Sequence, residues 1–132
     1  MNKNFLIEQC RRLDVIHQKE SYELTQEGLD TKWLLVHNNG HKQLIDEFVN
    51  LLEETEETDR KVLKKWLKKI IRLSNEVISD LDKKYNNFKN DEDMSKEDEE
   101  VYHRNDGVLC IAYTLINIID KKRYIAKLYR QK

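Results

Sequence analysis

The chain has 132 residues, the size of a single domain, and 39% of them are hydrophobic, which is enough to build a core. With no proline and three glycines it lacks the residues that turns between strands need, so turn-dense all-β folds are excluded and one all-α domain over residues 1–132 is expected. Lys and Arg number 24 and Asp and Glu number 25, a formal net charge of −1, so the chain as a whole is not attracted to nucleic acid or to an anionic membrane.

Apolar residues recur at helical spacing in the first half of the chain. The pattern predicts a helix over residues 3–24, capped by Asn2 or Asn4, and another over residues 41–54. Each of these helices presents one apolar side to a core. The positions that define them are Phe5, Leu6, Cys10, Leu13, Ile16, Leu44, Ile45, Phe48, Val49, Leu51 and Leu52.

Residues 31–37 lie between these two helices and fit either a helix or a strand that enters a hairpin at Asn39-Gly40. The helix is preferred because the apolar-polar alternation of a strand is missing. Glycine readily takes the left-handed conformation that follows a last helical turn, so Gly40 favours a helix end at this point. We therefore expect a short helix that stops before His41.

The clearest predicted element is a long amphipathic helix over about residues 59–88. At 1.5 Å per residue it would measure about 45 Å, so we expect it either to kink near Ser74-Asn75 or to protrude from the domain. A protruding seam would also favour a homodimer. The near-heptad seam consists of Leu63, Leu67, Ile70, Ser74, Val77, Leu81, Tyr85 and Phe88.

The last third of the chain predicts an acidic loop at residues 89–94 and a helix that starts at Ser95 with a capping-box pattern. Gly107 is expected to interrupt this helix. Residues 108–129 are apolar nearly all round at first and are predicted to form a buried hub helix. The expected architecture is therefore a four- or five-helix bundle.

The cellular setting is inferred from what the sequence contains. The apolar run at residues 108–119 is too short to span a bilayer, and the start of the chain lacks a secretory signal pattern, so a cytoplasmic protein without membrane contact is expected. Cys10 and Cys110 lie in apolar runs, as free cysteines of a reducing compartment often do. Abundant Lys, Asn, Ile and Leu with little Ala indicate a low-GC bacterium or its phage.

Two basic segments are the predicted partner-binding residues. The first is a stripe on the long helix, opposite its apolar seam and within about 17 Å along the axis. Such a stripe suits an acidic protein surface or phosphates, although Trp66, placed on the apolar side, offers no platform for stacking bases. The second segment is a basic-aromatic tail. The residues are Lys61, Lys64, Lys65, Lys68, Lys69 and Arg72 in the stripe, and Arg123, Tyr124, Lys127 and Tyr129 in the tail.

A first enzymatic alternative depends on Arg12 and His17. Their spacing resembles the short Arg-x-x-x-x-His motif of HEPN-type ribonucleases, which are all-α domains of about this length. That resemblance implies RNA cleavage in a dimer cleft, with Arg12 and His17 assisting attack by the ribose 2′-hydroxyl. In that family the motif usually lies late in the domain, whereas here it lies in the first predicted helix.

A second enzymatic alternative depends on acidic residues. The segment from Glu53 to Glu57 resembles the E-E-x-x-E half of the MazG-type NTP pyrophosphohydrolases, and Glu76 with Asp80 stands in for the second half, four residues apart rather than three. The resemblance implies Mg²⁺ bound by carboxylates on two paired helices. The candidate ligands are Glu53, Glu54, Glu57, Glu76 and Asp80.

Histidines and cysteines are the remaining candidate metal ligands. His37 and His41 are four residues apart, a spacing that binds Zn²⁺ when both lie on one helix, but the helix end expected at Gly40 breaks that geometry. Cys10, His17, His103 and Cys110 form no C-x-x-C or H-E-x-x-H motif with them. No metal and no cofactor are therefore predicted.

The sequence predicts a small, non-enzymatic regulatory protein, of inhibitor, antitoxin-like or adaptor type, that binds a macromolecule through charged helix faces. Another protein is the expected partner, and nucleic acid is the alternative partner of the basic stripe. Catalysis of the HEPN or MazG type is the alternative function.

Overall fold

The computed structural model describes residues 2–28, 32–54, 59–87, 89 and 91–121, and the regular structure in these ranges is helical throughout. This confirms the all-α prediction. The elements in chain order are α1 (Lys3–Gln26), α2 (Lys32–Glu54), α3 (Arg60–Lys84), the short 3₁₀ helix η1 (Asp91–Asp93) and α4 (Lys96–Ile119).

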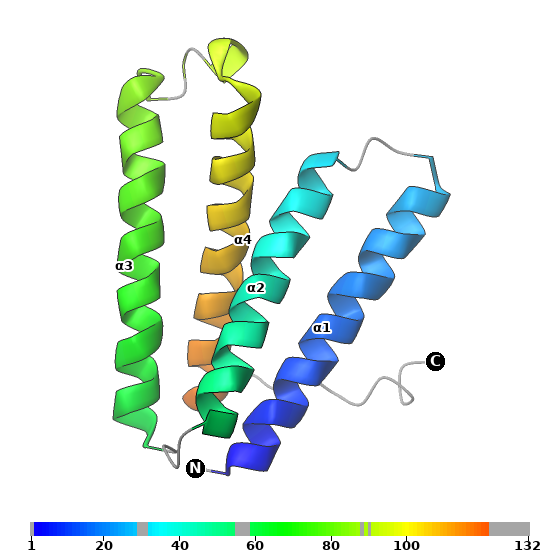
Figure 1. Cartoon of the computed structure of the whole chain (residues 1–132), viewed down its shortest axis with the longest axis vertical. Coiled ribbons are helices and arrows are strands. Elements are labelled where there is room, and N and C mark those ends of the chain that lie inside the picture. Colours follow the sequence, from blue (N-terminus) through cyan, green and yellow to red (C-terminus); the bar gives the residue numbers. More distant parts are fainter. Residues whose placement is uncertain (1, 29–31, 55–58, 88, 90, 122–132) are drawn as a thin grey trace.

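The helices pack in the spatial order α3, α4, α2, α1, because α4 contacts both α2 and α3 while α1 packs against α2 (Figure 1). The side chains of the main apolar cluster come from the first halves of α1 and α3 and from the second halves of α2 and α4. The core therefore fills one end of the bundle, the lower end in Figure 1. Its members include Leu6, Cys10, Leu13, Leu44, Phe48, Leu52, Leu63, Leu67, Ile111, Leu115 and Ile119.

Short polar side chains cap three of the helix starts, each by accepting a backbone N–H bond that the first helical turn leaves unpaired. The caps predicted at Asn2 and Ser95 are confirmed. Acidic residues in the first turn of α4 also suit the positive end of the helix dipole. The bonds are Phe5 N–H to Asn2 Oδ1 at 3.2 Å, Lys61 N–H to Asp59 Oδ1 at 2.8 Å and Asp98 N–H to Ser95 Oγ at 3.1 Å.

The helix α3 is shorter than predicted. It runs without interruption through Ser74, where a kink had been one alternative, and it ends at Lys84 because Asn86 and Asn87 take positive φ angles of 51° and 59°. Its 25 residues correspond to about 37 Å, no more than a turn longer than α1, α2 or α4. The predicted seam is buried at Leu63, Leu67, Ser74, Leu81 and Tyr85.

Two predicted helix interruptions, at Gly40 and Gly107, are wrong: α2 continues through Gly40 and α4 through Gly107. The physical reason is that these helices cross there with their backbones in close approach. A Cβ at Gly40 would lie 2.2 Å from the carbonyl oxygen of Arg104, and one at Gly107 would lie 2.0 Å from that of His37. Glycine inside a helix costs about 1 kcal/mol relative to alanine, and here it permits the contact.

The predicted hub helix corresponds to the second half of α4. Val108, Ile111, Ala112, Leu115 and Ile119 are buried among the other three helices, and the helix ends at Ile119 rather than at residue 129. Residues 122–132 lie outside the described part of the chain. Within the described ranges, no helix combines the length and the apolar character needed to cross a membrane.

Candidate functional site

The predicted basic stripe lies on α3, and most of it faces solvent. Lys61, Lys65, Lys68, Lys69 and Arg72 are exposed, whereas Leu63 and Leu67 on the opposite side are fully buried. We call these five cations the basic face. Within the described residues none of the five forms an ion pair with an acidic side chain, so their charges are presented to the surroundings.

Lys64, also predicted for the stripe, does not belong to the basic face. Its Nζ lies 2.9 Å from Oδ1 of Asp120 at the end of α4, and Arg60 Nη2 lies 3.1 Å from the same oxygen. Hydrogen bonds from Lys64, and then from Arg60, lower the pKa of the Asp120 carboxyl below its usual value. These two cations therefore join α3 to α4.

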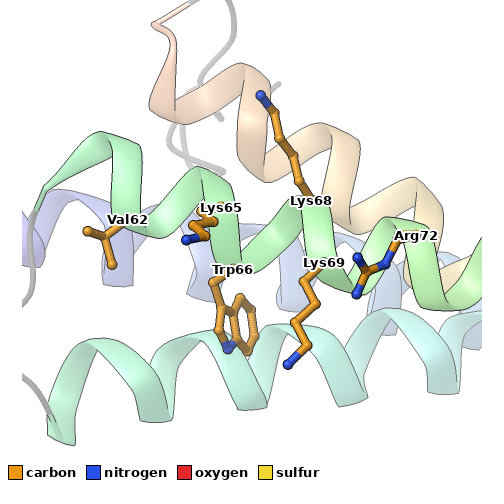
Figure 2. A pocket seen from close by; sticks show the side chains of 6 residues that line it. All are labelled: Val62, Lys65, Trp66, Lys68, Lys69 and Arg72. Carbon is orange, nitrogen blue, oxygen red and sulfur yellow. The ribbon is translucent and has the colours of Figure 1, made fainter.

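A hollow of about 610 Å³ lies along α3 beside the basic face (Figure 2). The sequence placed Trp66 on the apolar side, and its ring does approach Phe48, with ring centroids 5.9 Å apart, but it also lines this hollow. Figure 2 shows the indole and Lys69 extending in the same direction from α3. Val62 is 48% exposed and adds a further apolar contact surface. The lining residues are Val62, Lys65, Trp66, Lys68, Lys69 and Arg72.

The predicted tail residues Arg123, Tyr124, Lys127 and Tyr129 lie outside the described residues, as does Glu57 of the acidic candidates. Glu53 and Glu54 lie at the end of α2, at the same end of the molecule as the start of α3 (Figure 1). Glu76 is exposed about 24 Å further along α3, and Asp80 lies one turn beyond it. The structure therefore does not bring the described acids of the MazG-like pattern together.

Arg12 and His17, the HEPN-like pair, lie on α1. The Nε of Arg12 is 3.1 Å from Glu8 Oε1, one turn earlier on the same helix. The ring of His17 instead turns toward α2, where its centroid lies 4.0 Å from that of His41. Their assignment as a catalytic pair remains a prediction.

A second polar region surrounds the crossing of α2 and α4. Because α2 is continuous through Gly40, His37 and His41 lie on one helix a turn apart, and their ring centroids are 4.5 Å apart. Cys110 of α4 reaches the same place. One ligand atom from each of His37, His41 and Cys110 lies within 4.8 Å of the others. We call these three residues the crossing cluster.

His41 is the most buried member of the crossing cluster, with 6% of its surface exposed. Neither of its ring nitrogens has a hydrogen-bond partner among the described residues. Burial, assisted by the neighbouring His17 and His37, lowers the pKa of His41 to about 3. At neutral pH its imidazole is therefore uncharged, with a lone pair on one nitrogen.

The residues around the cluster hold it in place. Asp106, one turn before Cys110 on α4, lies with Oδ2 3.2 Å from Nδ1 of His37. Burial and the charge of Asp106 both raise the pKa of the Cys110 thiol. On the same side of α4, the ring of His103 stacks on Trp33 of α2, with ring centroids 5.0 Å apart. The crossing thus places polar groups from α1, α2 and α4 side by side.

Sequence reasoning named His37, His41 and Cys110 but separated them, because it assigned Gly40 to a helix end. The signal that connects them is the pair of glycines. Gly40 lies between the two histidines and Gly107 lies one turn before the cysteine, as expected where two helices approach without side chains between them. Comparison of the chain with known protein families, with curated proteins and with solved structures finds no match.

Proposed function

We propose that the protein is a small non-enzymatic regulatory protein, an adaptor or an inhibitor, that binds an acidic partner protein through the basic face of α3. The observation that carries the proposal is that Lys61, Lys65, Lys68, Lys69 and Arg72 have no acidic partner within the described part of their own chain. Like charges gathered without counter-ions repel one another, and an acidic surface relieves that repulsion while steering its own approach.

The surface beside these charges favours a protein over a nucleic acid. Val62 and Leu73 are 48% and 46% exposed, and with Trp66 they fall at positions i, i+4 and i+11, on one side of α3. Apolar and aromatic anchors between cations match protein interfaces, in which tryptophan and arginine contribute much of the binding energy. Binding along a phosphate backbone needs positive charge but no row of apolar and aromatic side chains. A partner helix with apolar anchors flanked by Asp and Glu has the complementary pattern.

The test is capture of a partner from extract of the native host at low salt, with identification by mass spectrometry and affinity measured on the purified partner. Reversal of charge in the triple variant Lys65→Glu, Lys68→Glu and Arg72→Glu is expected to weaken binding by more than about tenfold at low salt, and the difference should shrink as salt screens it. The matched control reverses the exposed Lys19, Lys89 and Lys96, which changes the net charge equally, and it should retain the partner.

The same variants measure the alternative partner. If the wild-type chain binds RNA or DNA with a steep salt dependence that the triple variant loses, and captures no acidic protein, the basic face is a nucleic-acid site instead. If the triple variant and its control bind the captured protein equally well, the interface lies elsewhere and the proposal is wrong.

A further inference from the structure

We propose that His37, His41 and Cys110 bind one divalent transition-metal ion of the Zn²⁺ class at the crossing of α2 and α4. The site is independent of the basic face of α3 and links two helices that both contribute to the core. Zn²⁺ and Co²⁺ prefer a set of donors that includes imidazole nitrogen and thiolate sulfur to a set made only of water and carboxylate oxygens.

The distances fit an ion after a small closure. Bonds of about 2.0 Å to nitrogen and about 2.3 Å to sulfur place the donor atoms of a tetrahedral zinc site about 3.3 to 3.7 Å apart. The donors here lie within 4.8 Å of one another, so the pair furthest apart needs to converge by up to about 1.5 Å. Cys110 is exposed and His37 is half-buried, so both side chains have room to turn toward the fixed His41.

The buried imidazole of His41 points independently to a ligand. Buried polar atoms in folded proteins nearly always have a hydrogen-bond partner, and those without one commonly contact a water or an ion. Both nitrogens of His41 lack such a partner in the described residues, although 94% of the residue's surface is buried. A neutral imidazole, with a lone pair on one nitrogen, is also the form that binds a metal.

The surroundings supply the support that metal-binding histidines usually have. A ligand histidine commonly donates its second N–H to a carboxylate, which fixes its tautomer and strengthens the metal bond. Nδ1 of His37 lies 3.2 Å from Asp106 Oδ2, a contact that favours the proton on Nδ1, and that tautomer leaves the lone pair on Nε2 for the ion. Asp106 is therefore a positioning residue. The close glycine crossing holds the two helices at a fixed separation, so the backbones that carry the ligands are in place before the ion arrives.

Binding has a defined proton balance. The Cys110 thiol releases one proton when its sulfur bonds to the ion, whereas a neutral imidazole releases none. Three protein ligands leave a fourth position of the tetrahedron for water, on the side where Cys110 meets solvent.

The test uses the untagged 132-residue chain, freed of metal with chelator and titrated with Co²⁺ and with Zn²⁺. We expect one ion per chain, a thiolate-to-cobalt charge-transfer band in the near ultraviolet, and a rise in unfolding temperature with Zn²⁺. Cys110→Ser should abolish the charge-transfer band, and His37→Gln and Cys110→Ser should each weaken binding at least about 100-fold. Asp106→Asn should weaken it about tenfold, because the carboxylate that orients the His37 ring is lost.

Two control variants separate a site from general thiol or imidazole affinity. Cys10 is buried in the core with its pKa raised to about 12, so Cys10→Ala should leave the cobalt spectrum unchanged. His103→Gln should do the same, because His103 stacks on Trp33 rather than joining the three donors. Absence of stoichiometric binding, or binding that Cys110→Ser and His37→Gln leave unchanged while circular dichroism shows both variants folded, would overturn the proposal.

Discussion

The basic face of α3 and the crossing of α2 and α4 are opposites in how they hold their polar groups. On α3, cations at Lys65, Lys68 and Arg72 extend into solvent, and their effect is a field that salt screens. At the crossing, His41 is enclosed and its neighbours are fixed by backbones in contact at Gly40. One small bundle therefore combines an exposed row of cations, whose field reaches beyond the surface, with an enclosed group of imidazoles and a thiol at a helix crossing.

The largest expected effect comes from separating the two crossing helices. Gly107→Ala places a methyl group against the carbonyl oxygen of His37, and because both are held by backbone no rotamer change relieves the overlap. The overlap destabilises the fold, while the higher helix propensity of alanine offsets part of that loss. The net result should be a free energy of unfolding lower by about 2 kcal/mol.

Urea denaturation followed by circular dichroism measures this change. The control is Asn117→Ala on the same helix, at an exposed position, which should be neutral or slightly stabilising. A Gly107→Ala variant as stable as the wild type would show that the helices do not approach closely, and the contrast between the two regions would lose its structural basis.

A second substitution separates stability from binding at the crossing. His41→Leu removes two buried nitrogens that lack hydrogen bonds and keeps the side chain near its original size, so in chelator it should raise the free energy of unfolding by about 1 to 2 kcal/mol. The same variant should lose all stabilisation by Zn²⁺. A thermal melt with and without the ion measures both quantities. Destabilisation of the metal-free chain would instead show that His41 already has partners within the fold.

The smallest effect concerns the boundary of the basic face. Asp120→Asn removes the carboxylate that binds Lys64 and Arg60, so two more cations become available and affinity for the proposed acidic partner should rise about twofold at low salt. Titration of the purified partner measures the gain. A fall in affinity would place Asp120 itself in the interface.

The pH dependence of stability in this variant has a definite sign. The pKa of Asp120 is lowered in the folded chain, chiefly by Lys64, so its ion pairs stabilise the fold above its usual pKa of 3.8, and this contribution is lost as the pH falls further. Wild type should therefore exceed Asp120→Asn in stability at pH 7, and the difference should shrink as the pH falls below 3.8 and through the lowered pKa of Asp120. A difference that stays unchanged throughout an acid titration would exclude the carboxylate charge as its cause.

The sequence was informative where local rules decide the structure. The α3 seam at Leu63 and Leu67 follows from the spacing of apolar residues, and the start of α4 follows from the capping preference of Ser95. The separation of cationic from apolar sides of α3 also follows from periodicity. Each of these features depends on residues within a few turns of one another.

The crossing could not be read in this way. A glycine within a helical pattern indicates either a helix end or a close approach, and only the helix on the other side distinguishes the two. The close approach at Gly40 is to the backbone of Arg104, and the one at Gly107 is to the backbone of His37. In each case the partner is more than 60 residues away in the sequence. Reading Gly40 as a helix end therefore also removed the pairing of His37 with His41.

The most direct test of the crossing is X-ray absorption spectroscopy of the zinc-loaded, untagged chain. The structure predicts a first shell of two imidazole nitrogens and one water oxygen at about 2.0 Å with one sulfur at about 2.3 Å. In Cys110→Ser the sulfur contribution should disappear while the imidazole scattering remains. A zinc shell of oxygen and nitrogen alone in the wild-type chain would contradict the convergence of α2 and α4 on one ion.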